Sequence, residues 1–255
     1  MSSSKRNDLI YPIISLSVVI LLWEGIVRLN NIPKYILPSP TNIVISLFND
    51  MDLIWMHTKV TLYEAFLGFG LAIIFAFLLA IIMDSFDIIK KLFYPLLVVS
   101  QTIPTIAIAP ILIIWFGFGT LPKILVVLMS CFFPIIINLI DGLDTIDPDY
   151  LKLFDLMEAS KIQTFRHLKG PIAAVHLLSG IKISATYMIV SAIVAEWLGG
   201  EKGIGVYMVR AKNSYALDKV FASILVIIII SLITIYSINF IGDHLIAWQK
   251  QEGAN

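Results

Sequence analysis

Long apolar stretches separated by short polar segments occupy most of this chain. A bilayer core about 30 Å thick needs about 20 apolar residues in a helix, because each residue rises about 1.5 Å and lipid satisfies no backbone polar group. Six stretches reach this length: Ile10–Leu29, Thr61–Met83, Leu92–Phe116, Leu121–Ile140, Ile172–Leu198 and Val220–Ile246. The pattern predicts an all-α membrane protein with six transmembrane helices, forming one domain over residues 1–255.

Two polar connections carry signals for further helices. After the first span, Ser39 and Pro40 are typical of a cap and a first helical residue, which predicts a short helix along the membrane surface. The longest polar segment, residues 141–171, lies between the fourth and fifth spans. There Asp147 and Pro148 can begin one helix and Ser160 can cap another, so a helical hairpin is expected on one membrane face.

Composition agrees with a chain that lies largely in lipid. Hydrophobic residues make up 58% and charged residues 14%, against roughly a quarter charged in an average soluble domain. The formal net charge is zero and no basic tract is present, so nucleic acid is not expected as a partner. The single cysteine, Cys131, lies in an apolar stretch and is expected to pack there.

Motifs of the common ATPase, protease and hydrolase sites are missing from the sequence. It has no phosphate-binding loop ending in Gly-Lys-Ser/Thr, no His-Glu-x-x-His and no Gly-x-Ser-x-Gly. The histidines are far apart, and the aspartates of residues 141–155 are expected to cap helices or face solvent. We therefore expect a protein that is not an enzyme and that holds no metal and no cofactor.

The third span is interrupted by Pro95, Pro104 and Pro110, each of which removes a helix hydrogen bond. Broken backbone at membrane depth is tolerated where it is buried in protein or lines a watery cavity. We therefore expect a solute pathway here. The polar side chains beside the central proline, of Gln101, Thr102 and Thr105, either contact a solute or satisfy the freed carbonyl groups, and the sequence leaves both readings open.

The fifth span is unusually polar for a helix surrounded by lipid, so it is expected to face a protein interior or a pore. Ser184, Tyr187 and Glu196 are its candidate pathway residues, although Glu196 also precedes a tryptophan suited to the membrane interface. The glycines between residues 199 and 205 fit a tight turn or a plain loop. The candidate pathway residues of both spans are Gln101, Thr102, Pro104, Thr105, Ser184, Tyr187 and Glu196.

Several segments, in order, resemble a known family. They are Leu37–Pro40, Ile103–Pro110, Trp115–Gly119, Ser179–Lys182, Ala195–Gly199 and Gly203–Gly205. Together they resemble the inner-membrane permeases of bacterial type I ABC importers, which depend on a binding protein, in the branch that takes up nitrate, sulfonates, taurine or thiamine precursors. The resemblance covers nearly the whole chain.

Permeases of this family carry a signature, Glu-Ala-Ala, three residues, Gly, nine residues, then Ile-x-Leu-Pro, whose helix docks in the ATPase. With Pro171 as the last residue, Lys152 stands at the glutamate, Glu158 at the glycine and Gly170 at the leucine. A negative side chain therefore occupies a position where close backbone packing is expected. The resemblance implies that ATPase coupling involves Lys152, Leu153, Phe154, Leu156, Met157, Glu158, Ala159, Ser160 and Lys161.

The resemblance also implies the partners and the orientation. It implies a homodimer of permeases, with the solute path at its axis, two cytoplasmic ABC ATPase subunits that bind ATP and Mg, an extracytoplasmic solute-binding protein and surrounding membrane lipid. Basic residues divide almost evenly between the two sides, so orientation rests on the coupling loop, which must face the ATPase. Residues 141–171 and both termini are then cytoplasmic, in a multi-pass protein of the bacterial inner membrane.

For the substrate, the resemblance implies a small organic solute. Residues 195–208 look closer to permeases for pyrimidine precursors of thiamine, or for riboflavin, than to those for sulfonates, taurine or nitrate. The alternative is a secondary transporter that is not powered by ATP, which should show inverted repeats and membrane-buried ionisable residues. Neither is clear from the sequence.

Overall fold

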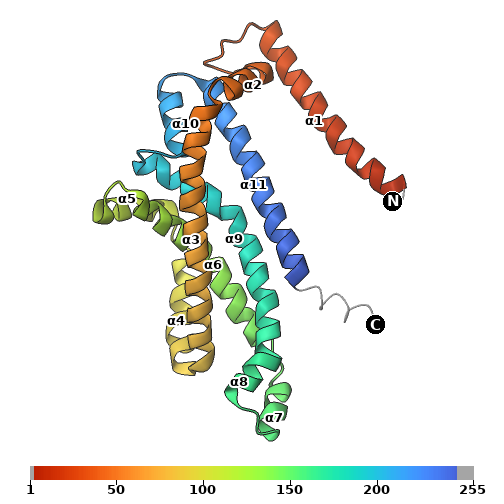
Figure 1. The fold of residues 1–255 in the computed structure, drawn as a ribbon, viewed down its shortest axis with the longest axis vertical. Helices are drawn as coiled ribbons and strands as arrows, with labels where there is room; N and C mark the ends of the chain where they lie inside the picture. Colours follow the sequence, from red (N-terminus) through yellow and green to blue (C-terminus); the bar gives the residue numbers. More distant parts are fainter. Residues whose placement is uncertain (1–2, 246–255) are drawn as a thin grey trace.

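A computed structural model describes residues 3–245, and these form helices joined by short links (Figure 1). The helices are α1 (Ser3–Leu29), α2 (Pro40–Asn49), α3 (Met51–Ser85), α4 (Asp87–Ser100), α5 (Thr105–Phe116), α6 (Thr120–Asp144), α7 (Pro148–Leu156), α8 (Lys161–Thr164), a π-helix (Phe165–Lys169), α9 (Gly170–Gly199), α10 (Ile204–Asn213) and α11 (Leu217–Leu245). The predicted all-α class is confirmed.

The membrane spans agree with the prediction in number and order. Five helical segments are long and apolar enough to cross a bilayer, and α4 with α5 passes the same test as a bent pair, which gives up to six spans. The second span begins about three turns before its predicted start, at Met51. The predicted last residue of the sixth span, Ile246, lies outside the described residues.

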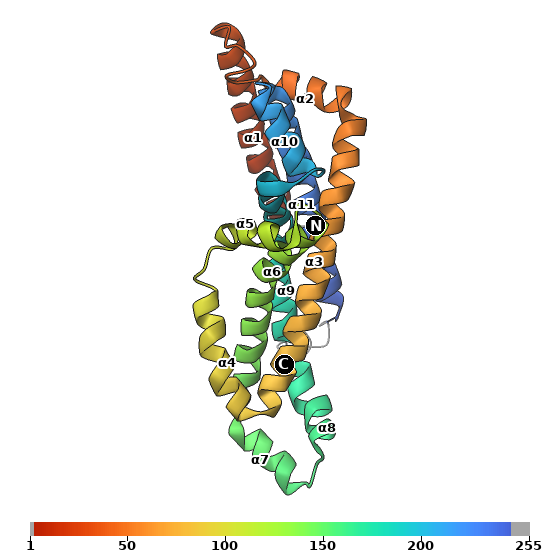
Figure 2. The same cartoon turned by 90° about the vertical axis from the view of Figure 1, so that its left-hand side faces the viewer.

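The break in the third span lies between α4 and α5, which meet at 100° (Figure 2). Pro104 stands at the break as the N-cap of α5, where its missing N–H and its effect on the preceding residue disfavour a continuous helix. Pro95 and Pro110 lie inside α4 and α5. The break was therefore predicted correctly, but of the three prolines Pro104 alone lies at it.

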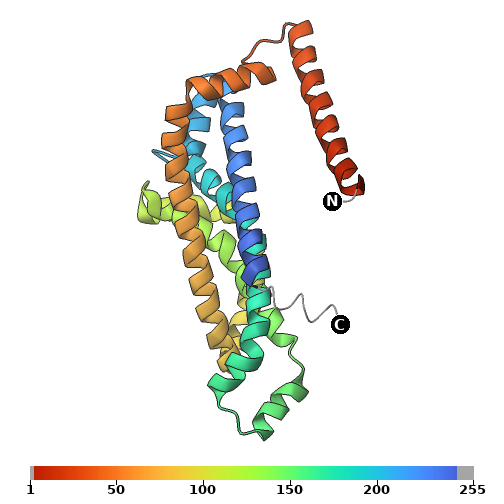
Figure 3. The same ribbon diagram turned by 45° about the vertical axis from the view of Figure 1, so that its right-hand side comes forward.

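The helices α3, α6 and α9 pack together as the centre of the molecule (Figures 1 and 3). Small residues allow their backbones to approach closely, as is usual between membrane helices. A Cβ atom at Gly68 would lie 2.7 Å from the carbonyl oxygen of Ile124, and one at Gly180 would lie 2.8 Å from the Cα of Ile135. By contrast, α1 stands apart from this centre, and most side chains of its residues 11–29 are exposed.

The helices and caps predicted in the two polar connections are present. Ser39 caps α2, accepting a hydrogen bond from the Asn42 N–H at 3.3 Å. Asp147 caps α7, and Ser160 and Gln163 form a reciprocal capping box at the start of α8. Figure 1 shows α7 and α8 as a hairpin at one end of the molecule, with α2 and α10 at the opposite end.

Two elements were not predicted. The first is α10, which follows Gly203, contains Gly205 and packs on α9 and α11. The second is the π-helix between α8 and α9, which the N–H of Gly170 closes by donating to the Phe165 carbonyl. A Cβ at residue 170 would lie 2.9 Å from that same oxygen. This close approach explains why glycine fits where the family signature has leucine.

Candidate functional site

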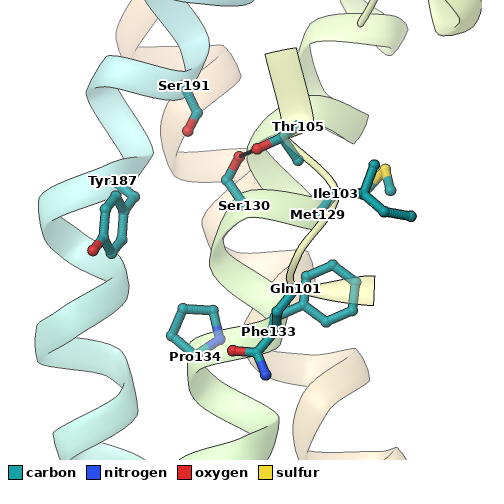
Figure 4. Close-up of a pocket in the computed structure, with 9 residues that line it drawn as sticks. All are labelled: Gln101, Ile103, Thr105, Met129, Ser130, Phe133, Pro134, Tyr187 and Ser191. Carbon is teal, nitrogen blue, oxygen red and sulfur yellow. Dashed lines mark hydrogen bonds between the residues drawn. The ribbon is translucent and has the colours of Figure 1, made fainter. Parts of the chain in front are cut away.

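A cavity of about 230 Å³ lies where the third span breaks. It is bounded by the α4–α5 link, by α5, by the middle of α6 and by α9 (Figure 4). Its lining residues are Gln101, Ile103, Thr105, Met129, Ser130, Phe133, Pro134, Tyr187 and Ser191. None of these described lining residues is charged.

The polar groups of this cavity fall into two kinds. Ser130 is already engaged, because its hydroxyl donates to the Val126 carbonyl at 2.9 Å and is hydrogen-bonded to the Thr105 hydroxyl at 3.1 Å. In the described part of the chain, no hydrogen bond involves the side chains of Gln101, Tyr187 and Ser191. An amide, a phenol and a hydroxyl are therefore free to bind an uncharged polar solute, and the rings of Phe133 and Tyr187 can stack on an aromatic one.

The structure separates the other predicted pathway residues from this cavity. Thr102 donates to the Val99 carbonyl at 2.7 Å, so it satisfies backbone freed by the break. Pro104 caps α5. Ser184 is buried and donates to the Cys131 carbonyl at 2.8 Å, across the contact between α9 and α6.

Glu196 also lies away from the cavity, in a buried polar cluster towards the end of the helices opposite the hairpin. Thr61 Oγ1 donates to its Oε1 and the Gly205 N–H donates to its Oε2, both at 2.6 Å. Thr61 also accepts from the Ile204 N–H at 2.8 Å. Glu196 thus fastens the turn between α9 and α10 onto α3.

Two more charged residues belong to this cluster, and the sequence interpretation did not single them out. Glu64 of α3 and Lys123 of α6 are both buried, with Lys123 Nζ 3.3 Å from Glu64 Oε1. Their positions inside apolar spans were the available signal, since ionisable residues there are rare. The cavity residues on α6 were not predicted either. The available signal was Ser130 and Pro134, a serine and a proline four residues apart within an apolar span.

The predicted coupling residues lie together in the hairpin of α7 and α8. Lys152, Leu153, Phe154 and Leu156 are on α7, Met157, Glu158, Ala159 and Ser160 form the link, and Lys161 begins α8. Large apolar side chains are exposed here: Leu156 is 83%, Met157 70% and Ile162 79% accessible. An apolar tip at the end of a polar loop is typical of a protein interaction site.

Glu158 has a left-handed backbone conformation, with φ of +54°. The Ala159 N–H donates to the Phe154 carbonyl and the Glu158 N–H to the Asp155 carbonyl, each at 3.0 Å, which is the Schellman pattern that ends a helix. Glycine is favoured there because it has no Cβ. The backbone angle alone therefore favours glycine at this position, and the Glu158 side chain is exposed on the hairpin. The close packing expected against the ATPase stays a prediction.

Comparison with known proteins identifies the family. Residues 68–251 match the family described as binding-protein-dependent transport system inner membrane component. The formylaminopyrimidine transport permease protein ThiX of Halalkalibacterium halodurans is 33% identical, over 94% of this chain and 96% of that protein. The taurine transport system permease protein TauC of Escherichia coli is 24% identical, over 93% and 89%.

A solved structure supports the fold. The inward-facing MetNI methionine ABC transporter contains a chain that matches with a TM-score of 0.56 and 18% identity, over 76% of this chain and 93% of that one. The match therefore supports the all-α membrane fold of the described helices. The chain belongs to the family of binding-protein-dependent transport system inner membrane components, and it is a multi-pass permease of the type I ABC importers.

Proposed function

We propose that this permease forms a homodimer whose solute path runs through the cavity at the α4–α5 break. The observation that carries the proposal is the cavity itself, which joins broken backbone to free neutral polar groups and two aromatic rings. The candidate contacts are Gln101, Thr105 and Tyr187, with Ser191 and Phe133 beside them. In a dimer, two such cavities facing each other would enclose a solute.

We propose a neutral heteroaromatic solute, of the formylaminopyrimidine kind, as the cargo. Two observations support it: the lining carries no charge, and identity is 33% to the formylaminopyrimidine permease against 24% to the taurine permease. An anion such as a sulfonate or nitrate would be expected to meet a basic side chain in its path, and the lining offers it only the first turn of α5, at Thr105. Riboflavin, the other heteroaromatic candidate, is a larger solute.

We propose that the hairpin of α7 and α8 docks in a cytoplasmic ATPase, which binds ATP and Mg, while a solute-binding protein delivers cargo at the opposite end. The exposed apolar tip supports this proposal. The start of α1 and the end of α11 both lie towards the hairpin side of their helices (Figure 1), which favours cytoplasmic termini once the hairpin is cytoplasmic. This orientation remains a prediction.

Uptake into vesicles tests the function. The permease is reconstituted with its cognate ATPase and solute-binding protein, and uptake of a labelled aminopyrimidine is measured with ATP on the side of the membrane that the hairpin faces. We expect ATP-dependent uptake that an excess of unlabelled taurine does not inhibit. Uptake that survives replacement of the phosphate-loop lysine of the ATPase would overturn the proposal in favour of the secondary transporter.

The coupling assignment is tested at Glu158. Glu158→Gly should stabilise the hairpin by about 1 kcal/mol, because glycine adopts the left-handed conformation without strain, and should preserve ATPase association. Glu158→Arg keeps the strain and reverses the charge, so it should weaken association. If the charge reversal changed neither association nor uptake, the docking assignment of this position would be wrong.

A further inference from the structure

Three ionisable side chains meet inside the bundle, towards the end opposite the hairpin. Glu64 is 0% exposed, Glu196 is 1% and Lys123 is 4%. Lys123 Nζ lies 3.3 Å from Glu64 Oε1. Thr61, whose hydroxyl donates to Glu196, precedes Glu64 by about one turn of α3, so the carboxyl groups of Glu64 and Glu196 lie near each other. Two carboxyl groups therefore share one ammonium group.

Other groups near the cluster supply no second positive charge. His57 of α3 accepts the Gly203 N–H on Nδ1 at 3.1 Å, so this nitrogen carries no proton and the imidazole is neutral. The charged neighbours from α3, from the turn and from α10 are exposed to solvent, where water and salt screen them. These neighbours are Lys59, Glu201, Lys202 and Arg210.

Charge balance then requires a proton. Two carboxylates and one ammonium would leave an uncompensated negative charge in the interior, which is costly. Two neighbouring carboxyl groups avoid this cost when one of them is protonated.

The hydrogen bonds indicate which carboxyl group holds the proton. Both oxygens of Glu196 accept a hydrogen bond, from Thr61 and from the Gly205 N–H, and such donors favour the ionised form. Neither oxygen of Glu64 accepts a hydrogen bond from any donor in the described part of the chain. A protonated Glu64 would donate to Glu196 and would thereby gain a hydrogen-bond partner.

We propose that Glu64 and Glu196 form a proton-binding site, in which Glu64 carries the proton and Glu196 is the carboxylate that holds the α9–α10 turn. A cavity of about 450 Å³, lined by Glu64, Lys123 and the exposed Glu201, gives the site a route for exchange with water. The proton is a resident ligand of the site, and ATP-driven uptake does not require its transport. Loss of the proton places a second negative charge beside Glu196 and loosens the turn.

Infrared spectroscopy of the purified full-length protein tests the site. At neutral pH we expect the carbonyl stretch of a protonated carboxylic acid, which shifts when the protein is labelled with ¹³C-glutamate and not with ¹³C-aspartate. This measurement needs no variant. The labelling also excludes the buried Asp218, which accepts a hydrogen bond from Ser46 at 2.7 Å, as the source of the band. Absence of a protonated glutamate at neutral pH would overturn the proposal.

Variants give opposite expected results. Glu64→Gln should remove the band, whereas Lys123→Met should increase it, because both carboxyl groups must then be protonated to avoid buried charge. Glu201→Gln, which changes an exposed carboxyl group of the same cavity, should leave the band unchanged. A band that survives Glu64→Gln, or that Lys123→Met leaves unchanged, would contradict the proposal.

Hydrogen exchange tests what the proton holds. Raising the pH until the band disappears should speed exchange of the Gly203–Gly205 amides beyond the intrinsic effect of pH. In Glu64→Gln this extra acceleration should be absent, because the carboxamide still donates to Glu196 and does not ionise. The same acceleration in both proteins would show that Glu64 does not control the turn.

Discussion

Tyr187 and Glu196 lie on the same helix, α9, in two regions that use polar groups in opposite ways. The cavity beside Tyr187 is neutral and several of its polar side chains have no partner in the described structure. The cluster around Glu196 is charged, buried and bonded to a neighbouring helix and to a turn. The polar groups of the cavity are free to bind a solute, whereas those around Glu196 are hydrogen-bonded within the protein and hold the α9–α10 turn. Polarity within a span therefore does not by itself indicate a pathway.

The largest expected effect is at Gly203. A Cβ there would lie 2.2 Å from the Glu196 carboxyl group, and φ is +118°, so Gly203→Ala combines a severe clash with a backbone conformation that alanine avoids. We expect loss of folded, monodisperse protein on size exclusion. Gly117→Ala is the matched control, because its φ of +81° and ψ of −174° are also typical of glycine but nothing lies within 4 Å, and it should cost about 1–3 kcal/mol of strain. Equal behaviour of the two variants would show that Glu196 is not tightly held.

A matched pair of isosteric substitutions compares the two regions directly. Thr61→Val removes the donor to Glu196 and the acceptor of the Ile204 N–H, leaving buried groups unpaired at about 2–4 kcal/mol. Its melting temperature in detergent should fall clearly. Thr105→Val removes a hydroxyl that is hydrogen-bonded to Ser130, which keeps its bond to the Val126 carbonyl. The melting temperature should therefore change little while uptake changes. The reverse result would exchange the roles assigned to the two regions.

Much of this fold could be predicted because length and hydrophobicity determine a span locally. The break at Pro104, the caps at Ser39, Asp147 and Ser160, and the hairpin are also local signals. The short helix α10 was missed because glycines precede it and its sequence, Ile204–Asn213, is too polar for a span and too short for a clear period.

The site was harder to predict, because membership depends on how α3, α6 and α9 pack. Of the predicted pathway residues, Gln101, Thr105 and Tyr187 come together at one cavity, while Ser184 and Glu196 face other helices. Glu64 and Lys123 could be recognised singly as charges inside spans. Their pairing across about 60 residues of sequence is a tertiary contact that no local pattern encodes.

Within the cavity, Tyr187→Ala and Gln101→Ala should each reduce uptake about tenfold, the equivalent of about 1.4 kcal/mol of binding. Both side chains are exposed and make no hydrogen bond in the described structure, so assembly with the ATPase and the melting temperature should stay close to wild type. Tyr187→Phe separates the hydroxyl from the ring. Loss of assembly in these variants would instead indicate that the two residues hold the dimer together.

The smallest expected effect is at Ser184, which was predicted to line the pathway. Its hydroxyl donates to the Cys131 carbonyl at 2.8 Å in the contact between α9 and α6. Ser184→Ala removes this bond, but the carbonyl remains in a helix, so we expect a loss of only about 0.5–1.5 kcal/mol of stability. The concentration of solute giving half-maximal uptake should not change, because the side chain does not reach the cavity. A clear change in that concentration without a change in melting temperature would show that Ser184 does contribute to the solute path, which would then extend into the contact between α6 and α9.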